Sequence, residues 1–297
     1  MIIFLTSSPT GPLDHSRAVD GLDDKNKFVE NLRKYWKEEM KTLYITAMPA
    51  DAGINEEIRK GMAAAFARKG FYFASAGAAG NSNGKTSLNE SGDADSSRGG
   101  FDIWDDRTED FSAEVLHSYD LIILGGGHVP TQNEFFQRIG LREKIQGFQG
   151  VIMGISAGTM NSADVVYAQP ELDGEAVDPN YQRYLTGLGL TKTQVLPHYQ
   201  MIKDSELDGM RVFEDITYGD SMGREFVALP DGSYILIERS GTSELKSVLS
   251  DREILENSEK PVLRTEIIWG EAYQIKDGMI QQICQENEQI TIEKICL

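Results

Sequence analysis

Short apolar runs alternate with helix-like segments along the first two thirds of the sequence, and this alternation restricts the fold more than any other feature. Residues 2–6 (IIFLT), 121–124 (LIIL) and 151–153 (VIM) are continuous apolar runs of strand length. Strands that are apolar on both sides belong to parallel sheets covered by helices on both faces. The pattern predicts an α/β fold with a doubly wound, mostly parallel sheet. Helices are expected between the strands, at residues 24–40, 54–69, 108–118 and 133–146.

The last third of the chain changes character, because strand pairs joined by Asp-Gly replace the alternation. Residues 225–239 read as a hairpin that turns at Asp231-Gly232, and residues 271–283 as a second one that turns at Asp277-Gly278. We therefore predict an α/β domain over residues 1–240. A C-terminal extension of a helix and β-hairpin, residues 241–297, packs on the same domain.

One segment interrupts the domain. Residues 77–100 are rich in Gly, Ser, Asn and Asp, which is typical of a mobile surface loop. Because this insert precedes the strand at 121–124, we expect it to lie close to the site described below. If it is a lid, its deletion should alter KM or the range of substrates and not the fold.

The composition limits the classes of molecule that the protein is expected to bind. The chain of 297 residues has a net charge of -18, whereas nucleic-acid binding requires a basic surface. No apolar stretch approaches the roughly 20 residues of a membrane span, and two cysteines do not make a disulfide framework. We expect a cytoplasmic protein that binds neither nucleic acid nor membrane, and a homodimer is one oligomeric state to test. No cluster of His, Cys and carboxylates has the spacing of metal ligands, so we expect no metal and no cofactor.

Three stretches with chemically useful side chains follow strands of the predicted sheet. GGGHVPTQN follows LIIL, SAG follows VIMGI, and PHY follows QVL. In open parallel sheets, sites form at the carboxyl ends of the strands. These three stretches are therefore expected to meet.

The stretch GISAG at 154–158 has the form Gly-x-Ser-x-Gly, which presents a nucleophile on a strand-to-helix turn. The same letters also occur where a serine merely caps a helix. A serine nucleophile needs a base within hydrogen-bond reach, and His198 lies at a strand end after a proline. A tetrahedral oxyanion needs two N–H groups. Ala157 is expected to supply one, and Gly126 or Gly127 the other.

An acid should orient the histidine and stabilise its charged form. Between Ser156 and His198, the loop AQPELDGE supplies two carboxylates, Glu171 and Asp173, and both fit this role.

Taken together, ILGGGHVPTQNEFF, GISAGTMNSA and LPHY resemble the peptidase S51 family, which contains dipeptidase E and cyanophycinase. The resemblance covers roughly residues 1–240 and implies a fold like that of class I glutamine amidotransferases. It also implies that Ser156 is the nucleophile, His198 the base and the GGG run the oxyanion loop. In dipeptidase E the acid lies fifteen residues after the serine, which points to Glu171.

Two departures from the family pattern concern substrate binding. The family's loop usually reads GGGN, and His128 replaces the asparagine. Dipeptidase E recognises aspartate partly through an arginine, and the nearest match here is Arg211 in GMRVFED. We take His128 and Arg211 as substrate-binding residues and expect substrate choice to depart from strict N-terminal aspartate.

The function expected from the sequence is a serine-type peptidase that hydrolyses a small peptide or amide through a Ser-His-Glu triad. Two alternatives stay open. An α/β-hydrolase esterase shares the order Ser, acid, His, and a ligand-binding protein could keep the fold without catalysis.

Overall fold

The computed structural model describes residues 1–11, 21–74, 100–108, 110–239 and 262–296. The predicted surface loop at 77–100 lies outside the described residues except for Gly100. Residues 240–261, at the start of the C-terminal extension, also lie outside them.

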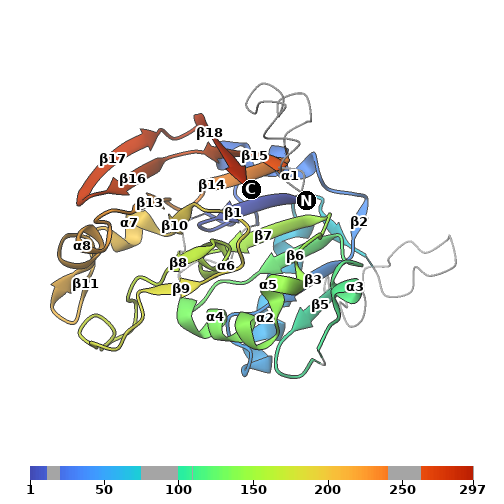
Figure 1. The fold of residues 1–297 in the computed structure, drawn as a ribbon. Coiled ribbons are helices and arrows are strands. Elements are labelled where there is room, and N and C mark those ends of the chain that lie inside the picture. The colour runs from blue at the N-terminus through green and yellow to red at the C-terminus, as the bar shows by residue number, and fades with distance from the viewer. Residues whose placement is uncertain (12–20, 75–99, 109, 240–261, 297) are drawn as a thin grey trace, which may run out of the picture.

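Among the described residues, the main sheet has eight strands (Figure 1). The strands in its centre and toward one edge are parallel, as the apolar runs predict. β1 pairs in parallel with β7, β7 with β6, β6 with β3, and β3 with β5. The α/β prediction is confirmed. The parallel strands are β1 (Ile2–Thr6), β7 (Val151–Ile155), β6 (Leu121–Leu124), β3 (Thr42–Ile45) and β5 (Phe101–Trp104).

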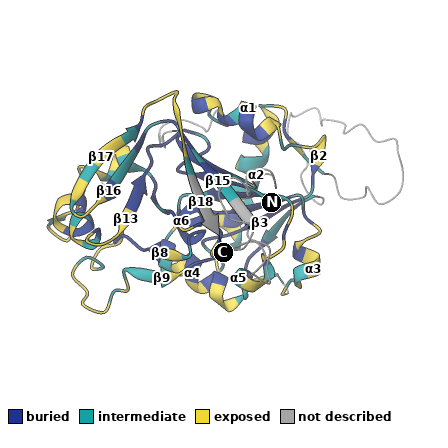
Figure 2. Cartoon of the chain, turned by 45° about the horizontal axis from the view of Figure 1, so that its top comes forward, coloured by how far each residue is buried: buried dark blue, intermediate teal, exposed yellow. Residues whose placement is uncertain are grey.

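Alternate residues of each strand point to opposite sides of this sheet. Both sides are apolar, and helices cover both faces. Leu5 of β1 belongs to one buried cluster and Phe4 to the other. The first cluster holds side chains of α3 (Ala113–Leu116), α4 (Val129–Arg138) and α5 (Leu141–Lys144), and the second holds side chains of α1 (Phe28–Arg33) and α2 (Ala52–Ala67). Figure 2 shows the strands of this region as largely buried. Each fully buried Leu, Ile or Phe contributes roughly 1.5–3 kcal/mol to the stability.

Several helices are shorter than predicted. The helix expected at 24–40 is a 3-10 turn (Lys25–Lys27) followed by α1, which ends at Arg33 because Trp36 turns inward and packs on the ring of Phe71, 4.8 Å away. The chain then forms β2 (Glu39–Met40), which pairs with β4 (Tyr72–Phe73). The helix expected at 133–146 is divided between α4 and α5 at Gly140, whose φ of 60° ends the first helix.

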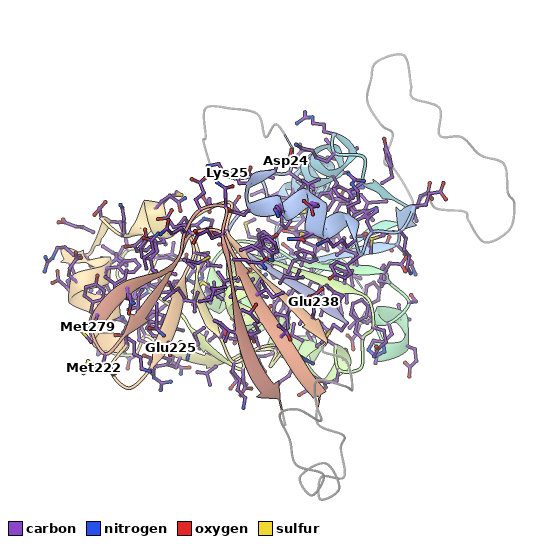
Figure 3. The ribbon with its side chains drawn as sticks, turned by 90° about the horizontal axis from the view of Figure 1, so that it is seen from above. Asp24, Lys25, Met222, Glu225, Glu238 and Met279 are labelled. Carbon is purple, nitrogen blue, oxygen red and sulfur yellow. The ribbon has the colours of Figure 1, made fainter. Side chains whose placement is uncertain are left out.

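The C-terminal strands extend the main sheet and build a second one. β14 (Tyr234–Arg239), β15 (Val262–Trp269) and β18 (Gln289–Cys296) continue the main sheet in antiparallel fashion. β10 (Gln194–Leu196), β13 (Glu225–Ala228), β16 (Ala272–Lys276) and β17 (Met279–Cys284) form the small sheet. Figure 3 shows Met222 and Met279, both exposed, together with Glu225 toward the outer end of this small sheet.

Of the two predicted hairpins, one is confirmed and one is wrong. β16 and β17 pair across Asp277-Gly278, with Lys276 opposite Met279. β13 and β14, in contrast, do not pair with each other, because they belong to different sheets. The residues between them, 229–233, cross from the small sheet to the main one.

A third buried cluster joins the small sheet to the rest of the chain. It contains Ala157 of the segment after β7, Leu196 of β10 and Phe226 of β13. None of the described helices is both long and apolar enough to cross a membrane. The remaining short elements pack around this cluster: α6 (Ala157–Asn161), β8 (Val165–Tyr167), β9 (Tyr184–Thr186), α7 (Tyr199–Ile202), β11 (Glu206–Leu207), β12 (Met210–Arg211), a π-helix (Val212–Thr217) and α8 (Tyr218–Asp220).

Candidate active site

Ser156 lies between the end of β7 and the start of α6, with φ 50° and ψ -110°. This is a strained conformation for a residue with a side chain. The turn is tight because Gly158 packs on β6: a Cβ there would lie 2.2 Å from the carbonyl oxygen of Leu124. The sequence GISAG thus forms the strand-to-helix elbow that it predicts.

His198 follows β10 and also has a positive φ, 57°. Its Nε2 lies 2.9 Å from Ser156 Oγ. The backbone N–H of His198 donates to Ser7 Oγ at 2.8 Å, and Ser7 comes directly after β1. Three strand ends therefore converge, and the serine hydroxyl can donate to the imidazole.

The acid on the other side of the imidazole is Asp231. His198 Nδ1 lies 2.7 Å from Asp231 Oδ1. The expectation that Glu171 or Asp173 holds this ring is wrong: Asp173 is exposed, and Glu171 contacts a different histidine. The physical reason is that residues 229–233 cross from the sheet of β13 to the sheet of β14, which brings Asp231 into contact with His198.

The Asp231 carboxylate has several donors besides the imidazole. Ser7 Oγ donates to Oδ1 at 2.7 Å, and Gln200 Nε2 donates to Oδ2 at 2.7 Å. The Gln200 Oε1 accepts the backbone N–H of Asp231 at 2.9 Å, which closes the arrangement. Burial raises the pKa of Asp231, but the hydrogen bond and charge of His198, with those of Ser7 and Gln200, outweigh it and hold the pKa below its usual value. The side chain, 1% exposed, is ionised at neutral pH.

Sequence reasoning missed Asp231 and Ser7, although a signal for both was present. Asp231-Gly232 has the composition of a hairpin turn, and this interpretation concealed the carboxylate. Both residues follow strands, and β1 and β13 each run parallel to a strand that ends at Ser156 or His198. The strand-end criterion that selected Ser156 and His198 would also have selected these two.

The GGG run lies beside the serine. A Cβ on Gly126 would stand 3.4 Å from Ser156 Cβ, so this glycine borders Ser156 directly. Gly125 anchors the run, since its carbonyl accepts the N–H of Gly158 at 3.0 Å and the Nε2 of Gln132 at 2.7 Å. Within the described part of the chain, no hydrogen bond occupies the N–H groups of Gly126, Gly127 or Ala157. These N–H groups are available to a ligand beside Ser156.

Part of the chain is similar to a known peptidase family. A model of peptidase family S51 matches residues 101–245, the stretch that contains Ser156, His198 and Asp231. Over this stretch the chain resembles peptidase family S51. The resemblance drawn from the three motifs is confirmed, and the match supports a peptidase.

Solved structures similar to this chain include a peptidase from an acI-B1 Actinobacterium. The likeness has a TM-score of 0.51 at 15% identity and covers 98% of this chain and 96% of that one, which supports the fold. A candidate peptidase E from Listeria monocytogenes EGD-e gives a TM-score of 0.46 at 16% identity over 79% of this chain and 93% of that one. No curated protein matches the sequence.

His128, which replaces the asparagine expected in S51 loops, is held on both ring nitrogens. Its Nδ1 lies 2.8 Å from Thr131 Oγ1, and its Nε2 lies 2.8 Å from Glu175 Oε1. Glu171 Oε1 is 4.0 Å from the same Nε2. The structure thus places Glu171 beside the residues that follow the GGG run.

Arg211, the other predicted substrate-binding residue, makes a bidentate ion pair with Asp215. Its Nε and Nη2 donate to the two carboxylate oxygens at 3.0 and 2.6 Å. The hydrogen bonds from Arg211 lower the pKa of Asp215 to about 2, so both groups are charged at neutral pH. The Arg211 side chain is 57% exposed, and among the described residues it forms hydrogen bonds with Asp215 alone.

Three or more metal-ligating side chains do not gather at any one point in the described ranges.

Proposed function

We propose that the protein is a serine-type peptidase that hydrolyses a small peptide or amide through Ser156, His198 and Asp231. The observation that carries the proposal is the unbroken chain of contacts from Ser156 Oγ to His198 Nε2 and from His198 Nδ1 to Asp231 Oδ1. It is supported by the match of residues 101–245 to a model of a peptidase family.

In the proposed reaction, Ser156 Oγ attacks the carbonyl carbon of the substrate while His198 Nε2 takes its proton. The ionised Asp231 keeps the remaining imidazole proton on Nδ1 and stabilises the imidazolium. N–H groups of Ala157 and of Gly126 or Gly127 bind the oxyanion. His198 then gives the proton to the leaving amine, and water hydrolyses the acyl-serine by the reverse sequence.

The order of these residues weakens the esterase alternative. An α/β-hydrolase has its acid between the serine and the histidine in sequence, whereas Asp231 follows His198. A ligand-binding protein without catalysis would not require the strained backbone of Ser156 or its contact with His198.

The first prediction concerns the nucleophile. Ser156→Ala should lower kcat by several orders of magnitude, because it removes the atom that forms the acyl intermediate. The change is measured on a dipeptide mixture and by covalent labelling with a fluorophosphonate. Ser162→Ala is the matched control, since Ser162 Oγ only donates to the carbonyl oxygen of Gly158. Labelling or turnover that survives in Ser156→Ala would refute the mechanism.

The second prediction concerns substrate choice. Because Asp215 already neutralises Arg211, this arginine should not create a strict preference for N-terminal aspartate. We expect kcat/KM for Asp-X to stay within about a hundredfold (~2.7 kcal/mol) of that for Ala-X, Gln-X and Ser-X dipeptides. A larger preference for Asp-X that Arg211→Ala abolishes would contradict this.

A further inference from the structure

The carboxylate of Asp231 has a hydrogen-bond partner on each oxygen, and one of these partners has no part in the proposed reaction. Asp231 Oδ1 lies 2.7 Å from His198 Nδ1 and accepts from Ser7 Oγ at the same distance. Asp231 Oδ2 accepts from Gln200 Nε2, also at 2.7 Å. Because both oxygens are engaged, the carboxylate cannot turn about its Cβ–Cγ bond without losing a hydrogen bond.

Gln200 reaches Asp231 from the same short segment as His198. Gln200 is the second residue of α7, and His198 is the residue just before this helix. One segment therefore brings an imidazole to Oδ1 and an amide to Oδ2. The separation of these two contacts is set by the backbone of that segment alone.

The orientation of the Gln200 amide is determined by the backbone of Asp231. Gln200 Oε1 accepts the N–H of Asp231 at 2.9 Å, and an N–H group acts only as a donor. If the amide were turned over, its Nε2 would face this N–H and its Oε1 would face the carboxylate, so both contacts would become repulsive. Gln200 therefore presents a donor, and not an acceptor, to Asp231 Oδ2.

The direction of the Asp231 carboxylate decides which nitrogen of His198 carries the proton. In a neutral imidazole one ring nitrogen is a donor and the other is an acceptor. A carboxylate oxygen aimed at Nδ1 keeps the proton there, which leaves Nε2, 2.9 Å from Ser156 Oγ, as the acceptor. With the proton on Nε2 instead, the serine hydroxyl would have no base.

We propose that Gln200 is a positioning residue that fixes the orientation of the Asp231 carboxylate and, through it, the His198 tautomer with the proton on Nδ1. The proposal rests on the proposed function, because this tautomer matters only where Nε2 takes the proton of Ser156. Among the described hydrogen bonds, both side-chain contacts of Gln200 are with Asp231, so Gln200 acts through that residue.

The first test is kinetic. Gln200→Leu keeps the approximate size of the side chain and removes both hydrogen bonds, so kcat on the best dipeptide should fall about tenfold to a hundredfold, as misalignment of a reacting group does. Gln146→Leu is the matched control, since Gln146 is also exposed and its amide donates to the carbonyl oxygen of Arg142 at 3.1 Å. This control should keep the wild-type kcat.

A third variant keeps the test valid if Gln200→Leu does not fold. The amide of Gln200→Asn is one methylene shorter and cannot reach both the carboxylate and the N–H of Asp231. It should therefore change kcat in the same direction by a smaller factor. A wild-type kcat in a folded Gln200→Leu or Gln200→Asn enzyme would overturn the proposal.

The tautomer is measured without turnover, by NMR of the ring nitrogens at a pH where the imidazole is neutral. His198→Gln assigns the signal among the four histidines of the chain. In wild type the proton should be on Nδ1, and Gln200→Leu should move a measurable share of it to Nε2, whereas Gln146→Leu should not. A Gln200→Leu protein with a lower melting temperature and an unchanged tautomer would show a structural role only, and the proposal would be wrong.

Fluorophosphonate labelling separates this proposal from the proposed function. The labelling rate of Gln200→Leu should fall by about the same factor as kcat, because the same base activates Ser156 in both reactions. If wild-type Ser156 is not labelled, the proposed function fails, and the role of Gln200 fails with it. If wild type and Gln200→Leu are labelled at equal rates, the role of Gln200 alone is wrong.

Discussion

At the scale of single residues, the backbone conformation of Ser156 costs free energy that a serine with only a structural role would not require. Its φ of 50° and ψ of -110° cost on the order of 1–3 kcal/mol, and the surrounding packing must maintain them. His198 also has a positive φ. Two neighbouring positions of this kind, joined by a hydrogen bond, are typical of a functional site rather than of a helix cap.

Asp231 gives the third prediction. Asp231→Asn should lower kcat by about four orders of magnitude, because an amide favours the imidazole tautomer that cannot accept the serine proton. Steady-state kinetics on the best dipeptide measures the effect. Asp277→Asn is a close control, since Asp277 also precedes a glycine but accepts only from the Gly223 N–H among the described hydrogen bonds. Similar kcat values for Asp231→Asn and wild type would exclude Asp231 as the acid.

At the scale of elements, the loop after β6 combines a rigid anchor with an open edge. Gly125 lies over the buried ring of Tyr44, whose hydroxyl would be 2.4 Å from an added Cβ. Burial raises the pKa of Tyr44 to about 12, so the phenol stays neutral under Gly125. Gly126 faces the other way, toward Ser156, and a Cβ there meets its first neighbour at 3.4 Å.

The fourth prediction separates these two glycines. Gly125→Ala should lower the melting temperature by several degrees, because the buried Tyr44 ring cannot move away without a cavity or strain. Gly126→Ala should leave the melting temperature within about two degrees, since its Cβ has room, yet lower kcat at least tenfold by crowding the oxyanion position. Thermal denaturation and kinetics on the same preparations test both. A Gly126→Ala enzyme with full kcat would show that this loop does not border the reacting carbonyl.

Elements also explain what the sequence could and could not predict. Ser156 and His198 were found because each directly follows a recognisable apolar strand, and that information is local. Asp231 was missed because its environment depends on which sheet each flanking strand joins, and β13 and β14 join different sheets. Glu171 was predicted to be the acid from its spacing to Ser156. Spacing along the chain does not determine which histidine the side chain of Glu171 reaches, and in the structure this is His128.

At the scale of the whole molecule, the site is located where the two sheets meet. Ser156 and Ser7 follow strands of the main sheet, whereas His198 follows β10 of the small one. Asp231 lies on the segment that connects the sheets and accepts hydrogen bonds from Ser7, His198 and Gln200. The ionised carboxylate therefore helps to hold the sheets in register, and its charge contributes to folding as well as to the proposed catalysis.

The fifth prediction follows from two carboxylates whose pKa values move in opposite directions. The pKa of Asp231 is lowered in the native state, so its ionisation stabilises the fold. This contribution is complete above about pH 4, the pKa range of an unfolded aspartate, and is lost as the pH falls through the lower native pKa. Burial raises the pKa of Glu171, an effect that the charges of His128 and His198 do not cancel, so its ionisation opposes folding.

Urea denaturation of wild type, Asp231→Asn and Glu171→Gln between pH 3 and pH 7 tests both signs. The free energy of unfolding of wild type minus that of Asp231→Asn should increase with pH until about pH 4 and then level off. The same difference against Glu171→Gln should decrease as the pH rises above about 4, because the unfolded glutamate ionises first. Since Glu171 is 44% exposed, solvent screens its charge and its slope should be the shallower one. A difference for Glu171→Gln that increases with pH would mean that its carboxylate already has a cationic partner in the free protein, and the predicted sign would be wrong.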